Sequence, residues 1–137
     1  MKIVLDTNVI VSGLLSPYNA PGEIVRMVSS GILKLCYDAR ILSEYQSVLL
    51  RLKFKFDPEH IDALIDQIEA CGCIAASKPL PEKLPDADDE PFLEVALGAK
   101  ASYLITGNAI HYPLKLRQGI KIVSPNKFID IYRKLGL

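Results

Sequence analysis

The 137-residue sequence has no excess of charge of either sign, because 16 lysines and arginines balance 16 aspartates and glutamates. This balance excludes a strongly basic protein that coats nucleic acid by charge alone, although it allows a local basic patch. The three cysteines form neither a disulfide framework nor a zinc set, since only Cys71 and Cys73 are close together. We therefore expect reduced thiols and a cytoplasmic location.

Long apolar runs and low-complexity tracts are also missing. No apolar run approaches the ~18 residues that a membrane span requires, so we expect no membrane partner. The first residues, MKIVLD, fit a strand that ends at a carboxylate and do not fit a signal peptide. The chain is 50% hydrophobic, which excludes disorder, and no linker or repeat divides it. Residues 1–137 are therefore expected to form a single domain.

Short β-branched runs alternate with helical patterns along the chain, as is typical of an α/β domain with a parallel sheet. Strands are predicted at residues 3–5, 33–37, 73–76, 103–106 and 120–123. Helices are predicted to begin at Pro21, after Asp38, at Pro58, after Asp89 and after Ser124. The helix after Asp38 is expected to bury an apolar stripe that extends to Leu52. The predicted fold is a three-layer α/β/α sandwich around a central parallel sheet of about five strands.

Four polar residues are predicted to gather at one edge of this sheet. Asp6 follows the first strand, which we expect to be central in the sheet, and parallel sheets bind ligands beyond the carboxyl ends of their strands. Glu44 borders the apolar stripe of its helix, where burying a carboxylate is costly unless it is paired or binds a cation. Asp89 belongs to the densest acidic cluster, whose repulsion a divalent cation would relieve. Asn108 follows the fourth predicted strand and offers a neutral amide oxygen.

Each of these residues also has a simpler interpretation. Asp6 and Asp89 could cap the helices that follow them. Glu44 could extend to solvent or pair with a nearby arginine, Arg40 or Arg51. The fourth residue stands in a Thr-Gly-Asn sequence that is ordinary in turns. The placement of all four at one edge is the reason to prefer a site.

Four motifs carry a family resemblance: VLDTNV at residues 4–9, ILSEY at 41–45, DDEPFLE at 88–94 and YLITGN at 103–108. Their order and content resemble the PIN-domain family over essentially the whole chain. The resemblance is closest to small prokaryotic PIN proteins regarded as the ribonuclease toxins of toxin–antitoxin pairs. It implies a metal-dependent ribonuclease with an α/β/α sandwich, and it implies Mg²⁺ or Mn²⁺ as the cofactor.

The resemblance also implies roles for individual residues. The members of the acidic metal site, which are also the catalytic residues, would be Asp6, Glu44 and Asp89. The polar residues that support this site would be Thr7, Asn8 and Thr106. Relatives usually carry aspartate where this chain has Asn108, so this residue would be a neutral metal ligand. The missing charge leaves open whether one or two cations bind and whether the site is active.

A basic segment follows the Glu44 helix, in which Arg51, Lys53 and Lys55 alternate with apolar and aromatic side chains. Cations interleaved with aromatics suit single-stranded RNA, because phosphates pair with the cations and bases stack on the rings. Alternatively, Phe54 and Phe56 pack into the core or a dimer interface while the cations face water. The two histidines are interpreted as ordinary surface or turn residues.

Two functions from different classes follow. The first is a Mg²⁺- or Mn²⁺-dependent endoribonuclease, a toxin silenced by an antitoxin protein; the antitoxin and a homodimer follow from the resemblance only. The second is a degenerate PIN domain that binds RNA or a protein partner without cleaving, because Asn108 disables the site. A phosphorylated receiver domain fits less well, since it would require a lysine near Asn108.

Overall fold

A parallel sheet of five strands, in the order β3-β2-β1-β4-β5, forms the centre of a computed structural model that describes residues 1–136. The strands are β1 (Lys2–Leu5), β2 (Lys34–Tyr37), β3 (Cys73–Ile74), β4 (Tyr103–Ile105) and β5 (Ile122–Val123). The first strand lies in the middle, as the sequence predicts for the strand that Asp6 follows. The third and fifth strands are shorter than predicted, and both lie at the edges of the sheet.

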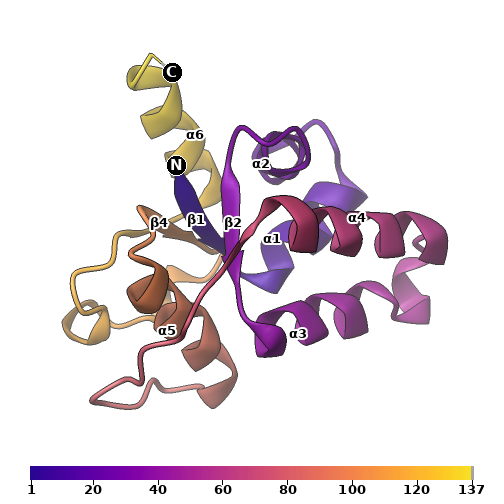
Figure 1. Ribbon diagram of the computed structural model, residues 1–137. Helices are drawn as coiled ribbons and strands as arrows, with labels where there is room; N and C mark the ends of the chain where they lie inside the picture. The colour runs from indigo at the N-terminus through magenta and orange to yellow at the C-terminus, as the bar shows by residue number, and fades with distance from the viewer. Residues whose placement is uncertain (137) are drawn as a thin grey trace.

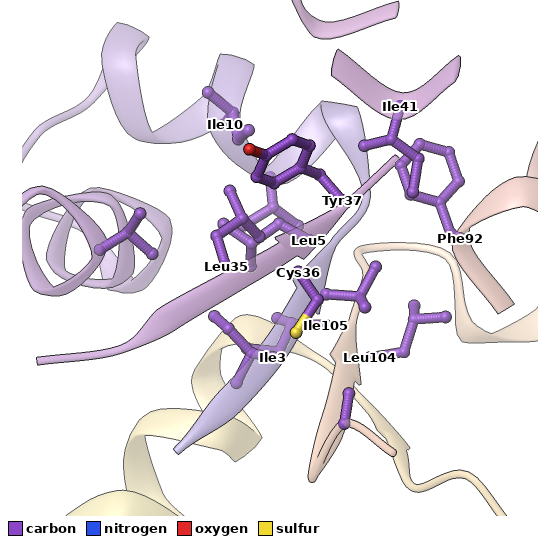
Figure 2. Close-up of a cluster of buried hydrophobic side chains, with 14 of the residues drawn as sticks. Ile3, Leu5, Ile10, Leu35, Cys36, Tyr37, Ile41, Phe92, Leu104 and Ile105 are labelled. Carbon is purple, nitrogen blue, oxygen red and sulfur yellow. The ribbon is translucent and has the colours of Figure 1, made fainter. Parts of the chain in front are cut away.

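The interior of the sheet is built around β1. Ile3 lies opposite Leu35 of β2 and Tyr103 of β4, so the strand is paired on both sides. Ile3 and Leu5 are at most 1% exposed, because helices cover both faces of the sheet. Figure 2 shows the aliphatic and aromatic side chains that pack around this strand. The end of β1 is therefore a rigid position, and Asp6 follows it directly.

Six helices surround the sheet within residues 1–136: α1 (Thr7–Leu15), α2 (Ala20–Ser29), α3 (Ala39–Leu49), α4 (Pro58–Cys71), α5 (Glu90–Ala99) and α6 (Pro125–Lys134). Figure 1 shows α5 on one side of the sheet and α1, α2 and α4 on the other. Short 3-10 turns η1 (Leu52–Phe54), η2 (Ala87–Asp89), η3 (Ala109–His111) and η4 (Leu114–Leu116) occupy the loops. The predicted three-layer sandwich is confirmed. None of the helices within residues 1–136 has both the length and the apolar character needed to cross a membrane.

Three of the predicted helix starts are confirmed by their capping bonds. The side chains of Asp38, Asp57 and Ser124 each accept a hydrogen bond from a backbone N–H in the first turn of the next helix. The sequence patterns do not predict α1, which begins directly after Asp6. This helix makes no side-chain capping bond and is apolar over most of its length, so neither a start signal nor a clear periodicity marks it.

The apolar stripe predicted for α3 extends to Leu52, and this part of the prediction is wrong, because Leu52 is 92% exposed. The helix ends at Leu49, where the N–H of Leu50 is shared between the carbonyls of Gln46 and Val48. Arg51 then adopts an extended backbone, with φ −63° and ψ 131°, which carries the next residue away from the helical face. A helical periodicity that continues past the real end of the helix explains the error.

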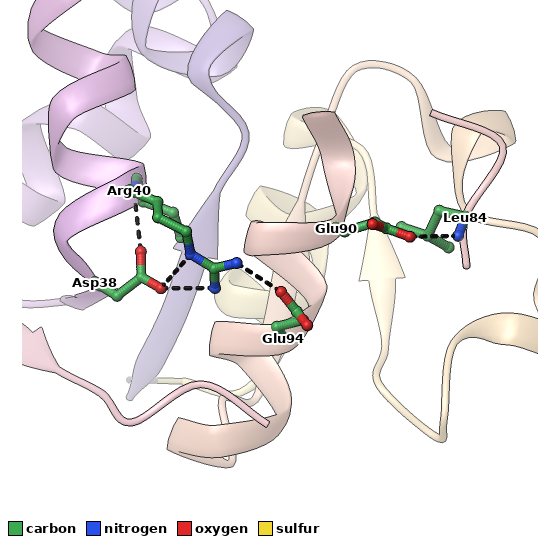
Figure 3. A network of polar contacts seen from close by, with 6 residues as sticks. Asp38, Arg40, Leu84, Glu90 and Glu94 are labelled. Carbon is green, nitrogen blue, oxygen red and sulfur yellow. Dashed lines mark hydrogen bonds and ion pairs between the residues drawn. The ribbon is translucent and has the colours of Figure 1, made fainter. Parts of the chain in front are cut away.

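One arginine ties α3 to α5 (Figure 3). Arg40, in the first turn of α3, donates to Asp38 Oδ2 at 2.7 Å and to Glu94 Oε1 of α5 at 2.8 Å. Such a partly exposed pair contributes about 0–1 kcal/mol, so its effect is mainly on geometry. It fixes α3, which carries Glu44, relative to α5, which follows Asp89.

The end of α3 gives a matched stability test. Leu49→Ala should lower the free energy of unfolding by about 2–5 kcal/mol, because this side chain is fully buried and its removal leaves a cavity. The same substitution at exposed Leu52 should change it by less than about 0.5 kcal/mol. Urea unfolding followed by circular dichroism measures both. Equal losses in the two variants would contradict the end of α3 described here.

Candidate active site

Asp6 lies at the carboxyl end of the central strand. Its backbone N–H donates to the Ile105 carbonyl at 3.0 Å, and its Oδ2 accepts a hydrogen bond from the Thr106 hydroxyl at 2.8 Å. The Thr106 oxygen in turn accepts from the N–H of Asn108 at 3.1 Å. The Asp6 side chain makes no capping bond to α1, so the capping interpretation is wrong for this residue. The chain of hydrogen bonds orients a carboxylate that is only 7% exposed.

Glu44 reaches the same place from α3. Its Oε2 accepts a hydrogen bond from the hydroxyl of Thr7, the residue that follows Asp6. Arg40 is bound to other carboxylates, and within residues 1–136 no ion pair joins Glu44 to Arg51. The pairing with an arginine that the sequence left open is therefore wrong. The Glu44 carboxylate is held by a neutral donor and keeps its charge uncompensated.

Asp89 ends η2 and directly precedes α5. It makes no capping bond and is 8% exposed, so the capping interpretation is wrong here too. Its Oδ2 is buried and accepts no hydrogen bond from any residue between 1 and 136. Nδ1 of His111 approaches this oxygen to 3.4 Å, which is close enough for an ionic contact. A buried carboxylate oxygen without a donor is unusual and is available to a ligand.

A cavity of about 160 Å³ joins these carboxylates. It brings together most of the residues that the sequence predicts, and its lining is Asp6, Thr7, Asn8, Glu44, Val48, Arg51, Asp88, Asp89 and Phe92. Thr106 is not part of the lining and acts on it through its bond to Asp6. Three segments far apart in sequence therefore supply carboxylates to one small cavity.

Other predicted residues lie outside this lining. Asn108 is exposed, and only its backbone N–H contacts the site through Thr106. Lys53 and Lys55 are exposed beyond the cavity, and Lys53 Nζ lies 5.0 Å from the centroid of the Phe54 ring. Phe54 and Phe56 stack at 5.6 Å and pack against the core, which favours a structural role for both rings.

Burial and mutual repulsion weaken the acidity of this cluster. Burial raises the pKa of Asp6, opposed by the hydrogen bond from Thr106 and by nearby backbone N–H groups. Burial, with the charges of Asp6 and Asp86, raises the pKa of Asp89 to about 6. The two carboxylates therefore resist being charged together, and a cation between them would relieve this resistance.

Sequence reasoning did not identify His111 or Asp88 as parts of the site. His111 was interpreted as an ordinary turn residue, and the 3-10 turn η3 instead brings it to Asp89. Asp88 is exposed, yet it also lines the cavity. Both residues lie close in sequence to the motifs, but this proximity does not predict where their side chains point.

The donors present fit a hard divalent cation in their chemistry. Carboxylate and hydroxyl oxygens are the ligands that Mg²⁺ and Mn²⁺ prefer, and Asp89 Oδ2 is a buried oxygen without a hydrogen-bond donor. As arranged, however, no three His, Cys, Asp or Glu side chains within residues 1–136 form a group that could hold a metal ion.

The raised pKa of Asp89 gives a testable pH dependence. The pKa of Asp89 is about 6 in the folded chain and about 3.9 in unfolded peptides. Its contribution to the free energy of unfolding is therefore fully present below about pH 4 and is lost as the pH rises through 6. In metal-free buffer, Asp89→Asn should gain stability relative to the wild type by about 1–2 kcal/mol between about pH 4 and pH 7. Urea unfolding at both pH values measures this gain. Asp130→Asn, which removes an exposed carboxylate from α6, is the control, and a pH-independent difference for Asp89→Asn would contradict the assignment.

Comparison with known proteins agrees with this architecture. The family model of the PIN domain matches residues 2–109, a range that contains all three carboxylates. The uncharacterized protein MJ1680 of Methanocaldococcus jannaschii is 25% identical over 145 aligned positions, which cover 98% of this chain and 93% of the relative. PIN domains are generally nucleases that act on nucleic acids, and they typically use divalent metals such as Mg²⁺ or Mn²⁺. The chain belongs to the PIN-domain family.

Proposed function

We propose that this protein is a metal-dependent endoribonuclease that hydrolyses phosphodiester bonds in RNA, with Asp6, Glu44 and Asp89 as its catalytic carboxylates. The observation that carries the proposal is the convergence of these three side chains on one cavity from β1, α3 and η2. Membership of a nuclease family supports the reaction class. RNA as the substrate is supported by the resemblance to small PIN ribonucleases.

Asp6 and Asp89 would hold the cation, because both are nearly buried and their carboxylates repel each other. Mg²⁺ or Mn²⁺, when bound, would supply positive charge against the phosphate oxygens and favour deprotonation of water near pH 7. Thr106 would keep Asp6 oriented through the 2.8 Å hydrogen bond described above. Asn108 would be a fourth, neutral ligand only if its exposed side chain turned toward the cavity.

Glu44 would accept the proton of the attacking water. It lies at the cavity with one hydrogen bond, from Thr7, so the remaining carboxylate lone pairs are available. The water oxygen then forms a bond to phosphorus, and the bond between phosphorus and the 3′ oxygen breaks. The products carry a 5′-phosphate and a 3′-hydroxyl. Asn8, which also lines the cavity, would offer its amide to a phosphate oxygen.

The RNA would approach along the basic segment that follows α3. Within residues 1–136, Arg51 is the cationic side chain that lines the cavity, while Lys53 and Lys55 lie farther along the same segment. Phosphates at and beside the cleaved bond would pair with these side chains. The proposal extends to a homodimeric toxin that an antitoxin protein silences, which the family resemblance supports. It also includes a cytoplasmic location, supported by the cysteine pattern, and a single domain, supported by the length and composition of the chain.

A second candidate is a PIN domain that binds RNA or a protein partner without cleaving. It is favoured by the lack, within residues 1–136, of three metal-ligating side chains grouped tightly enough to hold an ion. The neutral side chain of Asn108 also favours this candidate, because it adds no negative charge to the site. The two candidates differ in whether RNA is cut in the presence of a divalent cation.

The nuclease proposal predicts Mn²⁺-dependent cleavage of a mixed-sequence single-stranded RNA, with products that carry a 5′-phosphate. Asp6→Asn should lower the rate by more than about 100-fold, because it removes the charge of a ligand carboxylate. Thr106→Val should lower it by about 10- to 100-fold, because Asp6 loses the hydroxyl that orients it. Gel electrophoresis of end-labelled RNA measures all three proteins.

The control is Asp130→Asn, which removes an exposed carboxylate from α6, and it should cleave like the wild type. Equal residual cleavage by Asp6→Asn and the wild type would reveal a contaminating nuclease. No cleavage by the folded wild type, together with strong cleavage by Asn108→Asp, would favour the degenerate binding domain.

The position of Arg51 predicts a salt effect on RNA binding. In the uncleaving Asp6→Asn protein, Arg51→Gln should reduce the slope of log affinity against log salt concentration by about 0.7, the value for one phosphate contact on a single strand. Fluorescence anisotropy with a labelled RNA measures the slope. Lys34→Gln, at the amino end of β2 and therefore at the opposite end of the strands from the cavity, is the control and should leave the slope unchanged. An unchanged slope in Arg51→Gln would remove this residue from the RNA path.

A further inference from the structure

Two buried tyrosines near the acidic cavity differ in one respect. Tyr45 and Tyr112 are both 0% exposed. The Tyr45 hydroxyl donates to the carbonyl of Leu5 at 2.5 Å, next to Asp6. The Tyr112 hydroxyl is buried as well, but it has no hydrogen-bond partner among residues 1–136. Burying a hydroxyl without a partner is unfavourable, so a native fold that keeps one there calls for an explanation.

The backbone around Tyr112 holds the ring in place. Its N–H donates to the Ala109 carbonyl at 3.0 Å, and its own carbonyl accepts from Arg117 Nε at 2.7 Å. A second nitrogen of Arg117 donates to the Ala109 carbonyl at 3.2 Å. One arginine therefore ties the two ends of this turn together. The side chain that this turn carries is 0% exposed, so its hydroxyl lies inside the protein.

The same turn lies against the acidic site. His111, the preceding residue, approaches Asp89 Oδ2 to 3.4 Å. Burial, and then the charges of Asp6 and Asp89, raise the pKa of the Tyr112 hydroxyl far above its ordinary value. The hydroxyl is therefore protonated and able to donate a hydrogen bond at neutral pH.

The turn that carries Tyr112 thus contacts a carboxylate oxygen that lacks a hydrogen bond. Among residues 1–136, Asp89 Oδ2 accepts no hydrogen bond and has the ionic contact with His111, and the Tyr112 hydroxyl is a buried donor that has no acceptor. A phenylalanine would fill the same space without the hydroxyl, so packing alone does not require tyrosine here. A hydrogen bond from the hydroxyl to the ionised carboxylate cluster would explain why both groups are kept.

We propose that Tyr112 is a positioning residue of the acidic site, whose hydroxyl donates a hydrogen bond to the Asp89 carboxylate, directly or through one water, when a divalent cation is bound. The inference rests on the proposed metal-dependent function. Hydrogen bonds to the free oxygen of a ligand carboxylate fix its orientation, and their loss typically lowers metal affinity or activity by about 10- to 100-fold. The structure thereby adds a residue to the site that no sequence motif marks.

The test is Tyr112→Phe, studied by calorimetric titration with Mn²⁺ and by thermal unfolding without metal. Mn²⁺ affinity should fall by about 10- to 100-fold relative to the wild type. The metal-free melting temperature should stay the same or rise, because an unpartnered buried hydroxyl has been removed. A merely structural tyrosine would show the opposite pattern, with lower stability and unchanged Mn²⁺ affinity.

Two variants that lose the same single oxygen are the controls. Tyr45→Phe should lower the metal-free melting temperature by about 2–6 °C, because the Leu5 carbonyl loses its donor. Tyr103→Phe, at the start of β4 and far from the carboxyl ends of the strands, should change neither quantity appreciably. Together the controls separate a lost hydrogen bond from a lost hydroxyl.

The outcomes distinguish this inference from the function on which it rests. If the wild type binds Mn²⁺ and Asp6→Asn does not, but Tyr112→Phe binds as tightly as the wild type, only the role of Tyr112 is overturned. If neither the wild type nor Tyr112→Phe binds Mn²⁺, both the metal-dependent function and the role of Tyr112 are overturned. Weaker Mn²⁺ binding by Tyr112→Phe with undiminished metal-free stability supports both.

Discussion

The repulsion between buried carboxylates at the end of β1 is the constraint on which the rest of this structure depends. Asp6 and Asp89 are each less than 10% exposed, and each makes ionisation of the cluster less favourable. Such an arrangement opposes folding at neutral pH unless the surrounding structure holds it in place. A parallel sheet whose central strand is buried at residues 3–5 supplies that support, and a divalent cation bound between the carboxylates would relieve the repulsion.

The support comes from contacts that join elements far apart in sequence. Thr106 after β4 holds Asp6 after β1, and Tyr45 of α3 holds the carbonyl of Leu5. The Arg40 bridge between Asp38 and Glu94 fixes the start of α3 against α5. These bonds are individually weak, but each aligns an element that carries a carboxylate. The site is therefore a product of how the layers pack and not of any single loop.

Charge is distributed in a way that suits a polyanionic substrate. The chain is neutral overall, yet carboxylates cluster at its cavity. Arg51 lines the same cavity, and the lysines of its segment lie beyond it. A phosphate entering from this side would meet positive charge before negative charge. The phenylalanines between these cations pack on the core, so the basic side chains are displayed on a fixed support.

The sequence by itself determined the layers, the central position of β1, the capped starts of three helices and the three carboxylates, because periodicity, capping residues and motif order are local signals. Only the tertiary structure decided that α3 ends before Leu52, that Glu44 bonds to Thr7, and that Asn108 stays outside the cavity. It alone brought His111 to Asp89 and, among residues 1–136, left the Tyr112 hydroxyl buried without a hydrogen-bond partner. The physical reason is that side-chain direction and burial depend on neighbours from distant segments, which a single sequence does not display.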